Sequence, residues 1–208
     1  MKKYFVFALA AAFAFVACQQ DPEVKKDEKE DNNQEQNQNQ NQEQTGDDLM
    51  TTLCINEVCG VVGSKGIELY NPTDAQISLE GVAIYKNEAA DPTWTGDADA
   101  KIGPKGYFVI TSKKEFDDIA AVANAKAADS FSPSKSLILV LKDKTGTVLD
   151  TFDRGWAKNA NAEVALPTAT GSFARTADAK KEWKVLAITM GKTNNGAEVI
   201  GEISVDPE

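Results

Sequence analysis

Residues 67–73 read Ile-Glu-Leu-Tyr-Asn-Pro-Thr, and this stretch indicates the class of the fold. Ile67 and Leu69 alternate with Glu68 and Tyr70, which is the period of two expected of a β-strand with one apolar face. The Asn-Pro pair that follows is a turn signal. The stretch therefore predicts a strand that ends in a tight turn.

Short strands and turns continue along the chain beyond this stretch. We expect strands over 76–79, 82–85, 107–111, 137–141 and 148–152. The runs at 107–111 and 137–141 are continuously apolar, which is typical of strands covered on both faces. Regularly spaced short strands separated by turn residues predict an all-β sandwich.

One helix is expected to interrupt the strands. Ser112 and Glu115 form an S-x-x-E capping box. The following apolar positions fall on one helical face, and the stretch to about Ala127 is rich in alanine, a strong helix former. We expect this helix to cover one end of the sandwich, without a chemical role.

The chain divides into a short leader, a polar segment and a globular domain over residues 49–208. Between residues 19 and 48, Asn and Gln supply 13 of 30 residues, and ten acidic against three basic side chains give a charge of −7. Such a segment buries too little apolar surface to offset the entropy of ordering. We expect residues 18–48 to be a disordered tether, and a 160-residue domain to have a real core.

Residues 1–17 have the features of a signal peptide. Lys2 and Lys3 precede an apolar stretch of 13 residues, which is too short for a membrane-spanning helix of about 20. Ala17 stands directly before Cys18, as in a bacterial lipoprotein signal, in which the cysteine is acylated and becomes the new N-terminus. The alternative is an ordinary secretory signal with a coincidental cysteine.

The composition excludes several classes of function. The 208 residues include no His, which excludes Ser-His-Asp and Cys-His mechanisms and imidazole metal sites. Three Cys are too few for a four-thiolate zinc site or a disulfide scaffold. A net charge of −10 disfavours binding to duplex nucleic acid, which depends on Lys and Arg contacts with phosphates.

Seven stretches, in order, resemble the lamin tail domain, a family with an immunoglobulin-like β-sandwich. They are residues 55–58, 67–73, 77–84, 102–110, 146–152, 171–175, and Trp183 with the segment 189–194. Met190 stands where the family's closing segment has Pro. The whole chain also resembles single-domain lipoproteins of the Bacteroides type. The resemblance implies a binding or scaffold role and transfers no catalytic residues.

Acidic side chains are the first candidates for chemistry. Glu57 and Glu68 could form a carboxylate pair for acid–base work or cation binding, but they match family positions that the resemblance makes structural. Asp91, Asp97 and Asp99 could supply oxygen ligands to calcium. Their spacing matches no calcium loop with an invariant Gly and a terminal Glu, which favours a solvated loop.

Trp94 and Trp156 are the candidates for ligand recognition. Both lie in polar stretches beside Gly96 and Gly155, where a strand core needs no aromatic ring. Exposed rings could stack on the apolar faces of sugars. Alternatively, both rings pack over the rim of the sandwich, because Trp is highly buried on average. Trp183 is interpreted as a core residue.

Cys54 and Cys59 leave two possibilities open. Cysteines of an exported protein suggest a disulfide. On one continuous strand, however, the two would lie about 16 Å apart, and a bridge requires Cα atoms within about 7 Å. Either the strand bends near Cys59 or the thiols stay free.

Together these features predict a lipid-anchored extracytoplasmic binding or scaffold module, without catalytic activity or cofactor, at the outer membrane or cell surface. A periplasm-facing location is also open. Its partner would be an unidentified protein or a glycan. One alternative is a surface glycan-binding protein, and another is an accessory module of a secreted hydrolase or nuclease.

Overall fold

β-strands make up nearly all the regular structure of the computed structural model, which describes residues 48–130, 137–154 and 171–201. Within these ranges the elements are β1 (Cys54–Cys59), β2 (Gly66–Tyr70), β3 (Ile77–Ser78), β4 (Ala83–Lys86), β5 (Trp94–Thr95), β6 (Lys101–Ile102), β7 (Tyr107–Thr111), the 3-10 helix η2 (Asp117–Val122), β8 (Ala123–Lys126), β9 (Ile138–Lys142), β10 (Val148–Asp153), β11 (Gly171–Arg175), β12 (Trp183–Ala187) and β13 (Val199–Gly201).

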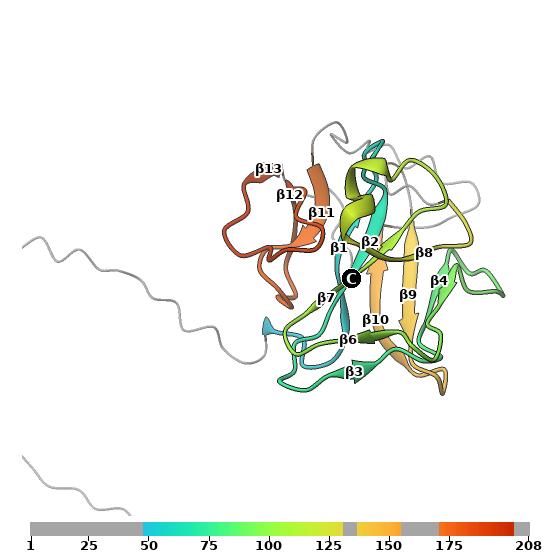
Figure 1. The fold of residues 1–208 in the computed structure, drawn as a ribbon. Helices are drawn as coiled ribbons and strands as arrows, with labels where there is room; N and C mark the ends of the chain where they lie inside the picture. The colour runs from blue at the N-terminus through green and yellow to red at the C-terminus, as the bar shows by residue number, and fades with distance from the viewer. Residues whose placement is uncertain (1–47, 131–136, 155–170, 202–208) are drawn as a thin grey trace, which may run out of the picture. The chain divides into compact units, whose positions relative to one another are not determined.

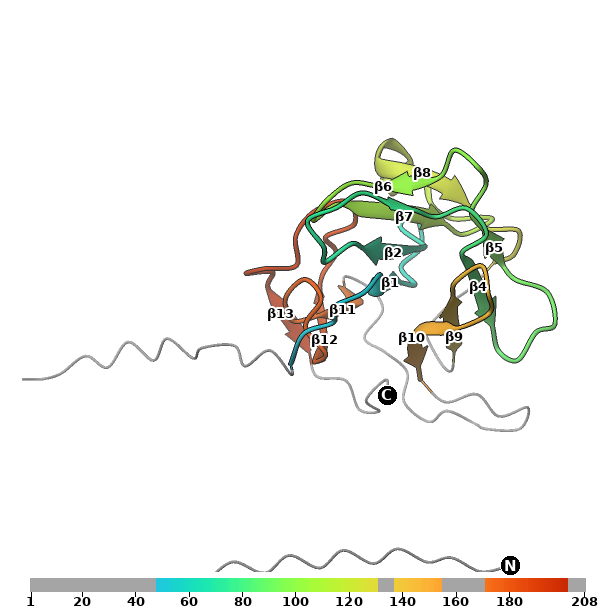
Figure 2. The ribbon, with the colours of Figure 1, turned by 90° about the horizontal axis from the view of Figure 1, so that it is seen from below.

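The strands form two main sheets (Figure 1). A seven-stranded sheet has the order β13-β12-β11-β1-β2-β7-β8, and a four-stranded sheet has the order β10-β9-β4-β5. Strands β3 and β6 pair separately. Neighbouring strands are antiparallel, except that β8 runs parallel to β7. Figure 2 shows the sheet of β9 and β10 beside the sheet of β1 and β2. The predicted all-β sandwich is confirmed.

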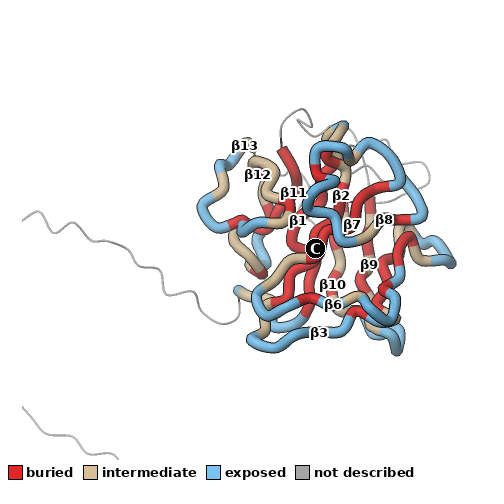
Figure 3. The backbone as a smooth tube through the Cα atoms, in the orientation of Figure 1, coloured by how far each residue is buried: buried red, intermediate tan, exposed pale blue. Residues whose placement is uncertain are grey.

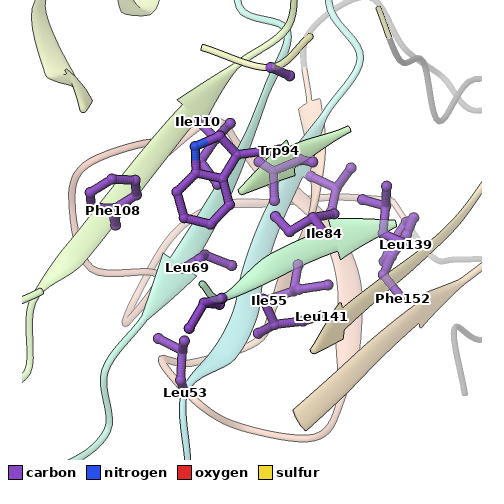
Figure 4. Close-up of a cluster of buried hydrophobic side chains, with 14 of the residues drawn as sticks. Leu53, Ile55, Leu69, Ile84, Trp94, Phe108, Ile110, Leu139, Leu141 and Phe152 are labelled. Atoms are coloured by element: carbon purple, nitrogen blue, oxygen red, sulfur yellow. The ribbon is translucent and has the colours of Figure 1, made fainter. Parts of the chain in front are cut away.

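The core lies between the two sheets, and the buried positions follow the strands (Figure 3). Strands of the larger sheet contribute Ile55, Leu69 and Phe173, and strands of the smaller sheet contribute Ile84 and Phe152. Each of these five side chains is fully buried. Figure 4 shows side chains of both sheets converging in this cluster. A core shared by two sheets is what holds a sandwich together.

A bulge in β1 decides which side chains face this core. Ile55 pairs with Leu69 and Glu57 pairs with Glu68, so Asn56 is an extra residue in the ladder. The extra residue lets Ile55 and Val58, three positions apart, both join the core. Asn56 and Glu57 are buried outside the apolar cluster, which sets up the polar site described below.

The turn after β2 is organised by Asn71, as the opening stretch of the sequence predicts. Its buried side chain donates to the carbonyl oxygens of Ala75 and Gly103 at 2.7 and 2.8 Å. Its Oδ1 accepts from the backbone nitrogen and hydroxyl of Thr73 at 2.9 and 2.8 Å. This side chain closes the turn and attaches it to the loop before β7.

The expected helix from Ser112 to Ala127 is wrong in its bounds and its type. The only helical turns in this part are η2, which begins after Phe116 without a side-chain cap. Glu115 has a positive φ of 62°, which an α-helix does not allow. Residues 123–126 instead form β8 and pair with β7. Tertiary pairing at this edge thus outweighs the helix preference of alanine.

Strand β9 also differs from its prediction. Its burial alternates between buried and half-buried residues, so only one face is fully covered, whereas β7 is buried at four of its five positions. The predicted signal segment, Cys18 and nearly all of the tether lie outside the described residues. In the part that is described, no helix is both long and apolar enough to cross a membrane.

Candidate functional site

Of the two tryptophans proposed for ligand recognition, Trp94 alone lies among the described residues. Trp94 is only 7% exposed, and its ring packs 5.5 Å from that of Phe108 within the core (Figure 4). This is the packing alternative, because a stacked sugar needs an open ring face. Trp156, like Cys18, lies outside the described residues. Trp183 is buried, and its ring lies 5.2 Å from that of Phe152, which confirms it as a core residue.

Glu57 is the centre of a buried polar cluster on the outer side of β1 and β2. Its Oε1 accepts from the Ser172 hydroxyl at 2.5 Å and from the Thr189 backbone nitrogen at 3.1 Å. Its Oε2 lies 2.6 Å from the Thr189 hydroxyl. Both carboxylate oxygens are therefore occupied by groups of the fold itself, and the side chain is fully buried.

Glu68 and Asp178 belong to the same cluster. Asn56 Nδ2 donates to Glu68 Oε1 at 2.9 Å and to Asp178 Oδ1 at 3.0 Å. Glu68 Oε2 accepts from the Gly191 backbone nitrogen at 2.6 Å. Asp178 Oδ2 accepts from the Tyr107 hydroxyl at 2.6 Å. These contacts join β1 and β2 to the loops on either side of β12.

Burial sets the electrostatics of the cluster. It raises the pKa of Glu57, and it raises the pKa of Glu68 to about 9, with the charge of Glu57 as a further cause. Burial and the hydrogen bond to Asp178 raise the pKa of Tyr107. Raised carboxyl pKa values often mark catalytic sites, but structural networks produce them too. Here each carboxyl group is enclosed by hydrogen bonds that connect loops and strands.

Asp150 and Arg175 form a second buried polar group. Asp150 Oδ2 lies 2.8 Å from Arg175 Nη2 and accepts from the Ile55 backbone nitrogen, also at 2.8 Å. Arg175 Nε donates to the Ile55 carbonyl oxygen at 2.7 Å. The guanidinium also lies 4.7 Å from the Trp183 ring. The pair thus satisfies the backbone of β1 at its bulge.

The two cysteines of β1 are free thiols at opposite ends of the strand. Both are fully buried, and burial raises the pKa of each thiol to about 12. The Cys54 thiol points to the carbonyl oxygen of Tyr70 at 3.8 Å. Of the two possibilities left open by the sequence, the structure has the unbridged one.

The acidic loop at residues 91–99 does not converge on one point. Asp97 Oδ1 accepts from the backbone nitrogens of Asp99 and Ala100 at 3.0 and 2.9 Å, so it stabilises the turn. Asp97, Asp99 and Trp94 are among the residues that line a shallow depression. Among the residues described, no three acidic or thiol side chains gather in a way that could hold a metal ion.

A pocket of about 370 Å³ opens at the end of the sandwich next to the start of β1. Apolar side chains line part of it, and hydroxyl groups and three charged side chains line the rest: Leu53, Ile77, Val82 and Leu149; Thr51, Thr52, Thr73, Ser78 and Thr145; Glu80, Asp143 and Lys144. Such a mixture suits a ligand or partner side chain with an apolar body and a polar rim.

The sequence did not single out most members of these sites. The pocket combines residues from four separate stretches, and nothing in the pattern shows that they meet. In the polar cluster, the sequence indicates Glu57 and Glu68 as a candidate carboxylate pair, but it does not indicate Asn56 or Asp178 as members of the site. The one signal that could have pointed to Thr189 and Asn194 is their place in the closing segment of the family resemblance.

Comparison with protein families finds a match to the Lamin Tail Domain over residues 49–156. The match begins just before β1 and continues past the end of β10. Strands β11, β12 and β13, which complete the larger sheet beside β1, lie beyond it. No curated protein matches the sequence.

Proposed function

Because the chain belongs to the lamin tail domain family, we propose that it is a binding or scaffold module without catalytic activity, held at a membrane by lipid on Cys18. The observation that carries the proposal is the family match on a sandwich whose buried carboxylates serve its own loops. Glu57 and Glu68 have no water-exposed surface. A general acid or base needs to reach the proton that it transfers.

The pocket beside the start of β1 is the proposed contact point for a partner. Its apolar side chains include Leu53 and Leu149, and its rim carries the exposed hydroxyl of Thr52. A protein side chain or a glycan with an apolar face would suit this lining. The pocket lies close to the end of the polar segment that would lead to the lipid.

Location is proposed to be the outer membrane or the cell surface. The support is the Ala17-Cys18 pair after a short apolar stretch, together with the long acidic segment that follows. Two or more acyl chains would anchor the protein stably. The polar segment would keep the domain clear of the lipid surface.

Membrane attachment is tested by Cys18→Ala. We expect the wild-type protein in the membrane fraction and the variant in the soluble fraction, with protease treatment of whole cells reporting which side the domain faces. A variant that still sediments with membranes at high salt contradicts lipid anchoring through Cys18.

Partner binding is tested with a glycan array and a panel of envelope proteins. Thr52→Trp fills the mouth of the pocket from an exposed position, and Val62→Trp is the matched control, because Val62 is 70% exposed and does not line the pocket. We expect Thr52→Trp to abolish binding of the partner and Val62→Trp to leave it unchanged. If the domain instead hydrolyses phosphoesters or glycosides, the role of a hydrolase or nuclease module replaces this proposal.

A further inference from the structure

The orientation of the Asn194 side chain is fixed by its neighbours. The side chain is fully buried, and its Nδ2 donates to the carbonyl oxygens of Asn56 and Arg175 at 3.2 and 3.0 Å. A flipped amide would place Asn194 Oδ1 against the carbonyl oxygens of Asn56 and Arg175, and none of these three oxygens carries a proton. The atom that faces Thr189 is therefore Oδ1, which can only accept.

The Thr189 hydroxyl has one proton and two acceptors. Its Oγ1 lies 2.6 Å from Asn194 Oδ1 and 2.6 Å from Glu57 Oε2. A hydroxyl donates one hydrogen bond. Because Asn194 Oδ1 carries no proton, Thr189 Oγ1 must donate its proton to Asn194 Oδ1. The contact with Glu57 then needs a proton that Glu57 supplies.

We propose that Glu57 is a neutral carboxylic acid whose proton locks the loop of residues 188–196 onto β1 and β2, and that ionisation of Glu57 opens this lock. The donors run in one direction, from Glu57 Oε2 to Thr189 Oγ1 and from there to Asn194 Oδ1. Glu57 Oε1 remains an acceptor for Ser172 and for the Thr189 amide.

The surroundings of Glu57 favour the neutral form. Glu68 faces it from β2 and Asp178 from the turn before β12, and both carry or can carry negative charge. Cys59 is a further titratable neighbour, on β1 itself. Burial and, to a lesser extent, the charge of Asp178 raise the pKa of Glu57, in the direction that the proton count requires.

The loop of residues 188–196 covers an apolar cluster, so opening of the loop would expose this cluster to water. Met190 is buried against Cys59, Val109 and Ile119. The next residue, Gly191, donates its amide to Glu68. Once Glu57 ionises, Glu57 Oε2 and Asn194 Oδ1 are both acceptors for the single Thr189 hydroxyl proton. One of these two oxygens then faces Thr189 Oγ1 without a proton between them, which is repulsive. Opening would then uncover the Met190 cluster, including the Cys59 thiol.

The protonation state is tested directly on the full chain. The ¹³C shift of the Glu57 side-chain carboxyl carbon, measured at neutral pH, is compared with those of protonated and ionised glutamate. We expect the protonated value. An ionised value at neutral pH overturns the proposal, and this measurement needs no variant to fold.

The lock is tested by hydrogen exchange at the Thr189, Gly191 and Asn194 amides, corrected for the intrinsic pH dependence of exchange. Each carboxyl that ionises on opening should raise the opening constant about tenfold per pH unit. Glu57→Gln keeps a hydrogen-bond donor towards Thr189 but has no carboxyl group to ionise. The variant should therefore lose one tenfold rise of the opening constant per pH unit and keep the one due to Glu68. Glu88→Gln, at an exposed site outside the pocket, is the control. An unchanged slope in Glu57→Gln contradicts the lock.

Discussion

Asp150 and Arg175 form an ion pair of 2.8 Å that joins the two sheets of the sandwich, Asp150 from β10 and Arg175 from β11. Their side chains are only 8% and 3% exposed. Both also bond the backbone of Ile55, one at its nitrogen and the other at its carbonyl oxygen. The pair thus fixes the β1 bulge against the opposite sheet.

Replacing Asp150 by Ala should lower the free energy of unfolding by about 3–5 kcal/mol, because it leaves a buried guanidinium without its counterion. The Ile55 amide loses its acceptor as well. Urea denaturation followed by tryptophan fluorescence measures the change.

The matched control is Asp74→Ala, which removes the exposed ion pair between Lys105 and Asp74. Surface pairs contribute little to stability, so this variant should unfold at nearly the wild-type denaturant concentration. Equal effects of the two substitutions would mean that the buried pair has no special role.

Trp94→Ala should destabilise the fold by about 3–5 kcal/mol, since it leaves a large cavity beside Phe108. A sugar-stacking residue at the surface would instead show a nearly unchanged melting temperature. Val62→Ala, at a side chain that is 70% exposed, provides the comparison in the same thermal melt.

Thr93→Val should stabilise the protein by about 1 kcal/mol, because the buried Thr93 hydroxyl has no hydrogen-bond partner among the residues that the structure describes. Valine has the same shape and no polar atom to desolvate. Thr111→Val is the matched control: the Thr111 hydroxyl donates to the Ala125 carbonyl oxygen at 3.3 Å, so its loss should be neutral or destabilising. A lower melting temperature for Thr93→Val contradicts the prediction.

Stability should fall as the pH rises from mildly acidic to alkaline. Burial raises the pKa of Glu68 from 4.5 to about 9, so between these values the folded protein holds a proton that the unfolded chain has lost. The free energy of unfolding then decreases by up to about 1.4 kcal/mol per pH unit for this group. Denaturant titrations across this range measure the slope. A profile that is flat across this range would mean that Glu68 is already ionised in the folded state.

The strands could be predicted where apolar residues alternate or run together, and β2, β7 and β10 lie where the pattern places them. The region from Ser112 to Ala127 could not, because its composition favours a helix while the open edge of β7 supplies backbone partners for a strand. Composition describes only the local preference; pairing with β7 is a contact between segments.

The polar cluster was unpredictable for a related reason. The alternation in β2 places Glu68 opposite the apolar face, where a solvent-exposed side chain is expected. In the fold, the segment around Gly191 covers this face, some 120 residues along the chain, and turns it into an interior. Neither the period of β2 nor the composition of the covering loop contains that information.

At neutral pH, Cys54 and Cys59 should react with a thiol reagent only after unfolding. They lie at the two ends of the six-residue strand β1, so no bridge can join them without breaking the strand. Both are fully buried, and their pKa values, raised to about 12, leave almost no thiolate at neutral pH. In the Cys18→Ala chain we expect no labelling of the native protein, and labelling of both cysteines in denaturant without reductant. Labelling that requires a reductant would show a disulfide, and labelling of the native protein at neutral pH would show that β1 is open to solvent.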